Sequence, residues 1–209
     1  DIGDKIDVDF GTGRGVREFE IIDFDHDYIS GTNDEQKAGI TFGVSQAFDT
    51  GINALYFDDS VYGQLDAYRL AIVDVGLKNN MKPARKYFGK QWTRSSVSSF
   101  EFRDNVYIGF PAAYELLGNL TAAAFGSGDN ISKINFASKM KQYPIYSTTS
   151  VLEEKLQFNQ DFDKVVIDVG ETAGHNLYAY KVVKVTGGAI SLSKGYETVD
   201  IFGLMQFYI

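Results

Sequence analysis

The residues best suited to chemistry in this chain form an acidic cluster at positions 23–27, which reads Asp-Phe-Asp-His-Asp. Asp23, Asp25 and Asp27 are two positions apart, a spacing that places three carboxylates on one face of a strand. Hard cations such as Ca²⁺ bind several carboxylate oxygens, so these residues are a candidate structural calcium site. A solvated loop edge is the better explanation, because Tyr28 stands where an EF-hand loop needs glycine and Asp34 where it needs its closing glutamate.

Histidine is scarce, with two in the chain, and this limits acid–base catalysis. His26 lies inside the acidic cluster, and His175 lies in a turn-like segment. The sequence contains no G-x-S-x-G nucleophile elbow, no HExxH zinc motif and no Walker phosphate loop. We therefore expect the protein not to be an enzyme and to need no cofactor. A glycoside hydrolase-like enzyme remains an alternative, because two carboxylates in a cleft suffice for that reaction.

Composition excludes several other classes of function. The chain has no cysteine, which rules out disulfides, thiolate metal sites and cysteine nucleophiles. Its formal net charge of −8 argues against binding to nucleic acid or to anionic membranes. No apolar run is long enough to span a bilayer, so membrane insertion is not expected. The chain opens on Asp1 without a leader pattern or Met, and we expect it to be processed or part of a longer polypeptide.

One basic stretch, between residues 78 and 94, interrupts this acidic chain. The side chains that we expect to contact a neighbouring subunit or an acidic partner are Lys82, Arg85, Lys86 and Arg94. A solvated face that balances nearby acidic residues explains the same stretch. Tyr87 and Trp92 are candidates for stacking on a sugar ring, although ordinary core packing also accounts for Trp92.

These residues must be positioned by the elements around them, and the N-terminal quarter predicts strands. Residues 1–10 alternate apolar and polar side chains, as a half-buried strand does. A glycine-rich turn at residues 11–15 then leads into a second strand, and together they predict a β-hairpin rather than a phosphate loop. Residues 39–48 predict another short strand.

The middle of the chain predicts the helices. Val61, Leu65, Tyr68, Ile72 and Val75 form one apolar stripe, which predicts a helix over about residues 59–79. Pro83 suggests a second short helix within residues 81–90. The serine-rich run that follows is expected to be a loop or an edge strand. Residues 105–110 predict a buried strand, and residues 111–118 a further helix.

The C-terminal part returns to strands. After a capping box at residues 150–153, the segments 164–170, 176–186 and 189–193 predict a ladder, with Gly187-Gly188 as a hairpin turn. Residues 203–209 predict a closing strand that is paired and buried. Strands, then helices, then strands indicate one α+β domain over residues 1–209, with a mostly antiparallel sheet and two to four helices packed on it.

Several of these segments, in order, resemble an uncharacterised domain family of phage virion proteins and bacterial surface proteins. That family is similar in appearance to C-type-lectin-like folds. The matching segments are Gly3-Asp4-Lys5-Ile6, residues 18–23, residues 53–56 with 60–65, residues 105–116, residues 188–191 and Phe207-Tyr208-Ile209. The family's late Trp-Leu-Arg-Ser motif has its nearest counterpart earlier in this chain, at residues 92–95.

The resemblance implies a non-enzymatic role and a possible C-type-lectin-like fold. It implies a virion structural protein, a capsid or tail decoration or adhesion module that is assembled in the host cytoplasm. Its partners would be other virion proteins or a host-surface receptor or glycan, with a homo-oligomer as the expected state. A secreted or cell-surface carbohydrate-binding module, and hence an extracellular location, is the alternative. The resemblance transfers no catalytic residues to this chain.

Overall fold

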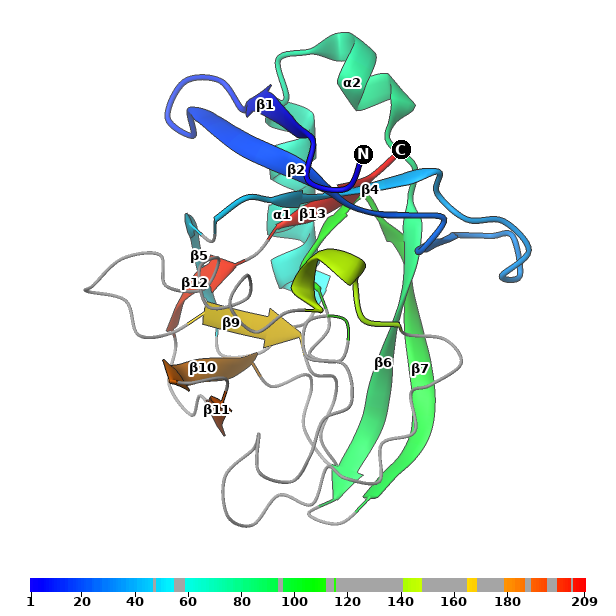
Figure 1. The fold of residues 1–209 in the computed structure, drawn as a ribbon, viewed down its shortest axis with the longest axis vertical. Coiled ribbons are helices and arrows are strands. Elements are labelled where there is room, and N and C mark those ends of the chain that lie inside the picture. The colour runs from blue at the N-terminus through cyan, green and yellow to red at the C-terminus, as the bar shows by residue number, and fades with distance from the viewer. Residues whose placement is uncertain are drawn as a thin grey trace.

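The computed structural model describes residues 1–46, 48–54, 59–93, 96–111, 115, 141–147, 165–168, 179–186, 189–194, 199–203 and 205–209. Their side chains are described over residues 1–46, 62–86, 102–111, 115, 141–147 and 205–209. The fold is α+β, with few helices and, among the described strands, antiparallel pairing throughout (Figure 1).

A five-stranded sheet forms the centre of the N-terminal part. Its strands, in spatial order, are β1 (Lys5–Asp9), β2 (Val16–Phe24), β4 (Ile40–Val44), β13 (Gln206–Tyr208) and β8 (Ile108–Gly109). The last strand of the chain thus lies between β4 and β8 rather than at an edge. Both termini consequently lie at the same end of the molecule in Figure 1.

A second sheet is built on a long hairpin. Its strands are β3 (Tyr28–Ile29), β6 (Ala84–Thr93) and β7 (Ser96–Val106), in the order β3-β6-β7. The hairpin of β6 and β7 runs away from the central sheet in Figure 1. The remaining strands are β5 (Phe48–Ala54), paired with β12 (Val199–Gly203), and the ladder of β9 (Val165–Asp168), β10 (Ala179–Thr186) and β11 (Ala189–Lys194).

Helix α1 (Asp59–Ala71) supplies the apolar face that covers the central sheet. Leu65 and Tyr68 are buried, and the Tyr68 ring meets Phe10 edge-on at 5.3 Å between ring centroids. Phe19 continues this contact to Phe207 on β13, at 5.0 Å. Two shorter helical elements are also described, α2 (Val75–Asn80) and the 3₁₀ helix Pro144–Tyr146. No described helix has the length and apolar character needed to cross a membrane.

Two predictions for the sheet are confirmed. β1 and β2 form an antiparallel hairpin, and Gly11, Gly13 and Gly15 in its turn adopt positive φ angles of 75°, 92° and 70°. Those angles favour glycine, which explains the glycine-rich turn. The closing strand is paired on both sides, and Gln206, Phe207 and Tyr208 are fully buried.

Two predictions for the middle of the chain need correction. The single helix predicted over residues 59–79 ends at Ala71, because the Val73 amide donates to Asp9 on β1 and Asp74 then caps α2 through the Leu77 amide. The short helix predicted within residues 81–90 is instead strand β6. Pairing with β7 stabilises that strand, a non-local contact that overrides the local preference.

Some predicted elements fall on residues whose structure is not described. The turn at residues 187–188 and the helix after Ser150 lie outside the described residues. Of the helix predicted over residues 111–118, Pro111 and Glu115 are described, and Glu115 is helical. The serine-rich run, predicted to be a loop or an edge strand, is a strand, because Ser96 to Ser99 belong to β7.

The close packing around Gly43 on β4 can be tested by replacing glycine with alanine. A Cβ added at Gly43 would lie 2.9 Å from Ile22 Cγ2 and 3.2 Å from the Tyr146 hydroxyl, both in the core. We expect Gly43→Ala to lower the free energy of unfolding by about 1–3 kcal/mol through overpacking. Gly63→Ala is the matched control, because a Cβ there meets open space on α1, and it should raise stability by up to about 1 kcal/mol. Urea unfolding measures both, and equal stability of the two variants would contradict the predicted packing.

Candidate functional site

Among the described residues, a group of ionisable side chains lies together in the core, and Lys86 lies at its centre. Lys86 Nζ donates to Asp27 Oδ1 at 2.9 Å and contacts Glu115 Oε1 and Oε2 at 2.6 and 2.8 Å. It also lies 3.2 Å from the Tyr143 hydroxyl. Lys86, Asp27 and Glu115 are only 5%, 4% and 3% exposed. We call these three residues, with His26, Thr41 and Tyr143, the Lys86 cluster.

Strand β6 positions Lys86 through the alternation of its side chains. Ala84 and Lys86 are both buried, whereas Arg85 between them points toward the opposite face and pairs with Asp104 at 2.8 Å. The β6–β7 register shifts between Ala84 and Lys86, where Asn105 on β7 has a φ of 61°. An amine on this buried face needs charged partners, since an unpaired buried charge is very costly.

Asp27 reaches the cluster from the segment between β2 and β3. Asp25 has a φ of 48°, a left-handed conformation that turns the chain after β2 ends at Phe24. The Asp27 carboxylate then accepts from Thr41 Oγ1 at 2.6 Å and from the Tyr143 hydroxyl at 3.0 Å. These two donors bind Oδ2, and Lys86 Nζ binds Oδ1, so both oxygens are occupied by donors, as a buried carboxylate requires.

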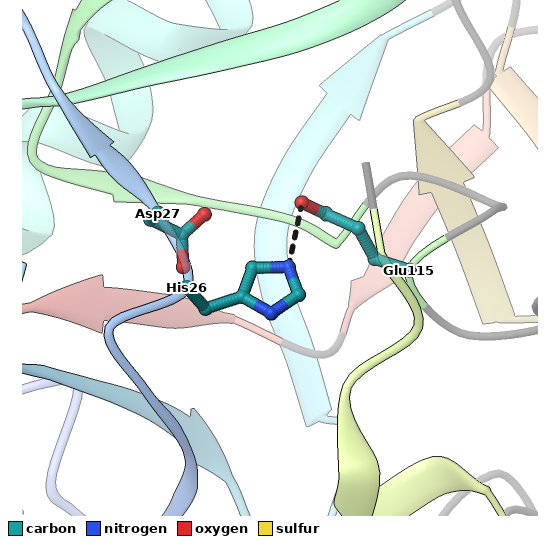
Figure 2. Close-up of side chains that lie close together, drawn as sticks. All are labelled: His26, Asp27 and Glu115. Carbon is teal, nitrogen blue, oxygen red and sulfur yellow. Dashed lines mark ion pairs between the residues drawn. The ribbon is translucent and has the colours of Figure 1, made fainter. Parts of the chain in front are cut away.

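His26 forms the other side of the cluster (Figure 2). Its Nε2 lies 3.8 Å from Glu115 Oε1, the pair marked in Figure 2, and its Nδ1 lies 2.6 Å from Asp23 Oδ2. The imidazole also packs on the Tyr143 ring, with 4.0 Å between centroids. Burial alone would lower the histidine pKa, but the hydrogen bonds to Asp23 and Glu115 and the charge of Asp27 outweigh it and raise the pKa to about 9.

Electrostatics keep Lys86, Asp27 and Tyr143 in their ordinary charge states at neutral pH. Burial opposes the charge of Lys86, yet Asp27 and Glu115 raise its pKa well above the usual value. Burial likewise opposes ionisation of Asp27, but the charges of Lys86 and His26 hold the pKa of that carboxyl below its usual value. Burial and the nearby carboxylates raise the pKa of Tyr143. The cluster thus holds the Lys86 ammonium, the Asp27 carboxylate and the neutral Tyr143 phenol.

A metal ion would have to compete with this ammonium. Potential ligand atoms of His26, Asp27 and Glu115 lie within 4.8 Å of one another, the one such group among the residues that the structure describes. The Lys86 ammonium already contacts both carboxylates, so it takes the place that a bound cation would occupy. This donor set therefore fits a metal poorly.

The predicted calcium residues are not brought together as ligands. Asp27 points into the core, Asp25 is exposed, and Asp23 binds His26 and the Phe24 amide. The expectation that these carboxylates share one strand face is wrong, because β2 ends at Phe24 before the left-handed Asp25.

The basic stretch also separates into different environments. Lys82 is exposed, and the Arg85 guanidinium pairs with Asp104 and lies 4.0 Å above the Phe102 ring. Lys86 is a correction to the predicted contact surface, because a side chain in the core cannot meet another subunit. Arg94 and the side chains of Tyr87 and Trp92 lie outside the described residues.

Sequence reasoning missed Glu115, Thr41 and Tyr143 and misplaced Lys86. Alternation along residues 84–86 would have assigned Lys86 to a buried face had that segment been predicted as a strand. No local pattern marks Glu115 or Tyr143, which lie 29 and 57 positions from Lys86. The chain matches no protein-family model, no curated protein and no solved structure.

Proposed function

We propose that this chain is a non-enzymatic structural protein of a phage virion, a decoration or adhesion module with a C-type-lectin-like fold. Its partners would be other virion proteins or a receptor or glycan on the host surface. The ordered sequence segments that resemble phage virion and bacterial surface proteins motivate the proposal. The observation that carries it is the closure of the Lys86 cluster, whose lysine and two carboxylates face one another in the core.

A buried cluster whose lysine and carboxylates face one another supports a structural role rather than catalysis. A general base or nucleophile needs access to substrate and a protonation state matched to its task. Lys86 is charged and shielded, and Tyr143 is neutral and buried. Charged groups satisfied in this way specify a rigid arrangement of strands rather than turnover of an external substrate.

An exposed apolar segment supports association with a neighbouring subunit. Leu70, Val73 and Val75 lie at the junction of α1 and α2 and are 61%, 56% and 61% exposed. Lys82, one of the predicted contact residues, is exposed just beyond the end of α2. A contiguous patch of exposed apolar side chains is typical of an association surface. We propose that a second copy of the chain covers this junction.

Native mass spectrometry of the purified chain tests the proposal. We expect a closed homo-oligomer that Val75→Glu dissociates, because a carboxylate in a dry interface is poorly solvated. The fold should tolerate this change, since glutamate is favourable in the first turn of a helix. Lys141→Glu is the control, an exposed charge change distant in sequence from the junction that should leave the oligomer intact.

Binding of labelled protein to virions and to bacterial cells completes the test. A monomer that binds neither and turns over a glycoside would contradict the proposal. A monomer that binds glycans on an array would instead identify a free-standing carbohydrate-binding module.

A further inference from the structure

The Lys86 amine and the Asp27 carboxylate form an ion pair, but they are also placed as two groups that could react with each other. Its amine lies 2.9 Å from Asp27 Oδ1, and Glu115 lies against the same amine at 2.6 and 2.8 Å. A primary amine, a carboxyl group and a second carboxylate that can accept protons are the groups needed to form an amide. All three are almost completely withdrawn from water.

We propose that Lys86 and Asp27 join in an intramolecular isopeptide bond in the folded protein, with Glu115 as the proton acceptor. The proposal is independent of any virion role, because it rests on the geometry of the Lys86 cluster alone.

The step needs no reagent beyond the two side chains. Lys86 Nζ gives a proton to Glu115 and attacks Asp27 Cγ, so that an N–C bond forms. The Cγ–Oδ1 bond breaks, and Oδ1 leaves as water after taking the proton held by Glu115 and a second proton from Nζ. The Tyr143 hydroxyl, 3.2 Å from Nζ and 3.1 Å from Oδ1, can pass that second proton. One ammonium and one carboxylate become one amide and one water, and nothing is oxidised or reduced.

Asp27 is the better electrophile of the two carboxylates that Lys86 touches. Its second oxygen, Oδ2, accepts a hydrogen bond from Thr41 at 2.6 Å, which leaves the single Tyr143 hydroxyl proton for Oδ1 during the reaction. The Thr41 donor stabilises the negative charge that develops on Oδ2 when the amine adds to Cγ. Glu115 instead meets the amine with both oxygens, the position of a base that takes a proton from it.

Burial favours the amide over the separated groups. Holding the reactants in contact gives an effective concentration on the order of 10⁵ M or more in well-oriented cases. The reaction also removes a positive and a negative charge from a medium that solvates them poorly. The positive charge of His26, 3.8 Å from Glu115, remains beside the carboxylate that is left. The cluster therefore keeps its charge balance after the water has gone.

The bond would fasten the long hairpin to the rest of the molecule. Asp27 precedes β3, and Lys86 lies near the start of β6, 59 positions along the chain. A covalent link between them holds the base of β6 against the segment that follows β2. Force that pulls Asp27 and Lys86 apart would act on this bond, and a heated chain would unfold with the bond intact and with less gain of entropy.

The test is the intact mass of the full chain, measured under denaturing conditions after incubation in the folded state. We expect wild-type protein to be lighter than its sequence by one water molecule. Tandem mass spectrometry of a tryptic digest should find the Asp27 and Lys86 peptides joined, with no cleavage after Lys86. Lys86→Met and Glu115→Gln should both show the full sequence mass, and Lys82→Met, which keeps the cluster, should still lose the water.

The wild-type mass decides the proposal even if the cluster variants fail to fold. A full sequence mass for folded wild-type protein would overturn it and leave a purely ionic cluster. A link from Lys86 to Glu115 rather than to Asp27 would overturn the assigned roles of the two carboxylates.

Discussion

Replacing Lys86 by methionine should lower the free energy of unfolding by about 3–5 kcal/mol, the cost of leaving buried charges without a partner. Asp27 and Glu115 would face each other in the core with no ammonium between them. Methionine fills a comparable volume, so the loss reports charge rather than a cavity. Urea unfolding of the full chain measures the change. If an isopeptide bond is present, its loss adds to the destabilisation.

Two further variants separate charge from other effects. Lys82→Met, on an exposed position four residues earlier, should change stability by no more than about 0.5 kcal/mol. Adding Asp27→Asn and Glu115→Gln to Lys86→Met should recover part of the loss, because no uncompensated charge then remains. A triple variant that is less stable than Lys86→Met would show that the carboxylates stabilise the core by some means other than pairing with lysine.

Stability should fall as the pH rises from about 6.5 to about 9, by about 3 kcal/mol in total, because the folded state binds the His26 proton more tightly than the unfolded chain. The folded pKa is raised, so this contribution is complete below about pH 6.5 and is lost as the pH passes about 9. In a chain without the bond between Asp27 and Lys86, Asp27 has the opposite sign: its lowered pKa gives stability that is lost in acid, below its usual pKa of 3.8. Unfolding curves measured in acid, down through pH 3.8, and from about pH 6.5 to about pH 9 measure the two arms.

Replacing each of the two histidines in turn tests the source of the loss of stability between pH 6.5 and 9. His26→Asn should remove most of the decrease between pH 6.5 and 9, since asparagine does not titrate. His175→Asn should preserve the decrease if His26 is its source. A decrease that survives His26→Asn would assign the pH dependence to another group.

Local patterns in the sequence predicted those parts of the fold that depend on neighbours in the chain. The glycines of the β1–β2 turn and the stripe that buries Leu65, Tyr68 and Ile72 are both short-range signals. The predicted apolar stripe is wrong at Val75, which is exposed, because a backbone hydrogen bond from Val73 to β1 ends the helix before that residue. Asp74, the N-cap of α2, was the local sign of that break.

The candidate site depended on contacts that no local pattern reveals. A lysine beside arginine in a basic stretch is typical of a solvated face, and Arg85 and Lys86 differ in burial only because β6 is a strand. That strand is specified by β3 and β7, through pairings such as Ile29 with Ala84. The glutamate and tyrosine that complete the cluster come from segments distant in sequence, so only the folded chain brings them to Lys86.

The place of β13 in the central sheet has a consequence for how the protein is made. A ribosome synthesises β1, β2 and β4 first, and β4 then waits with one edge unpaired for about 160 further residues until 206–208 emerge. Unpaired strand edges are sites of aggregation, and contacts between distant segments form slowly. Nascent chains of this protein should therefore depend on chaperones until the last strand has been translated, and a stalled chain should be recognised as unfolded.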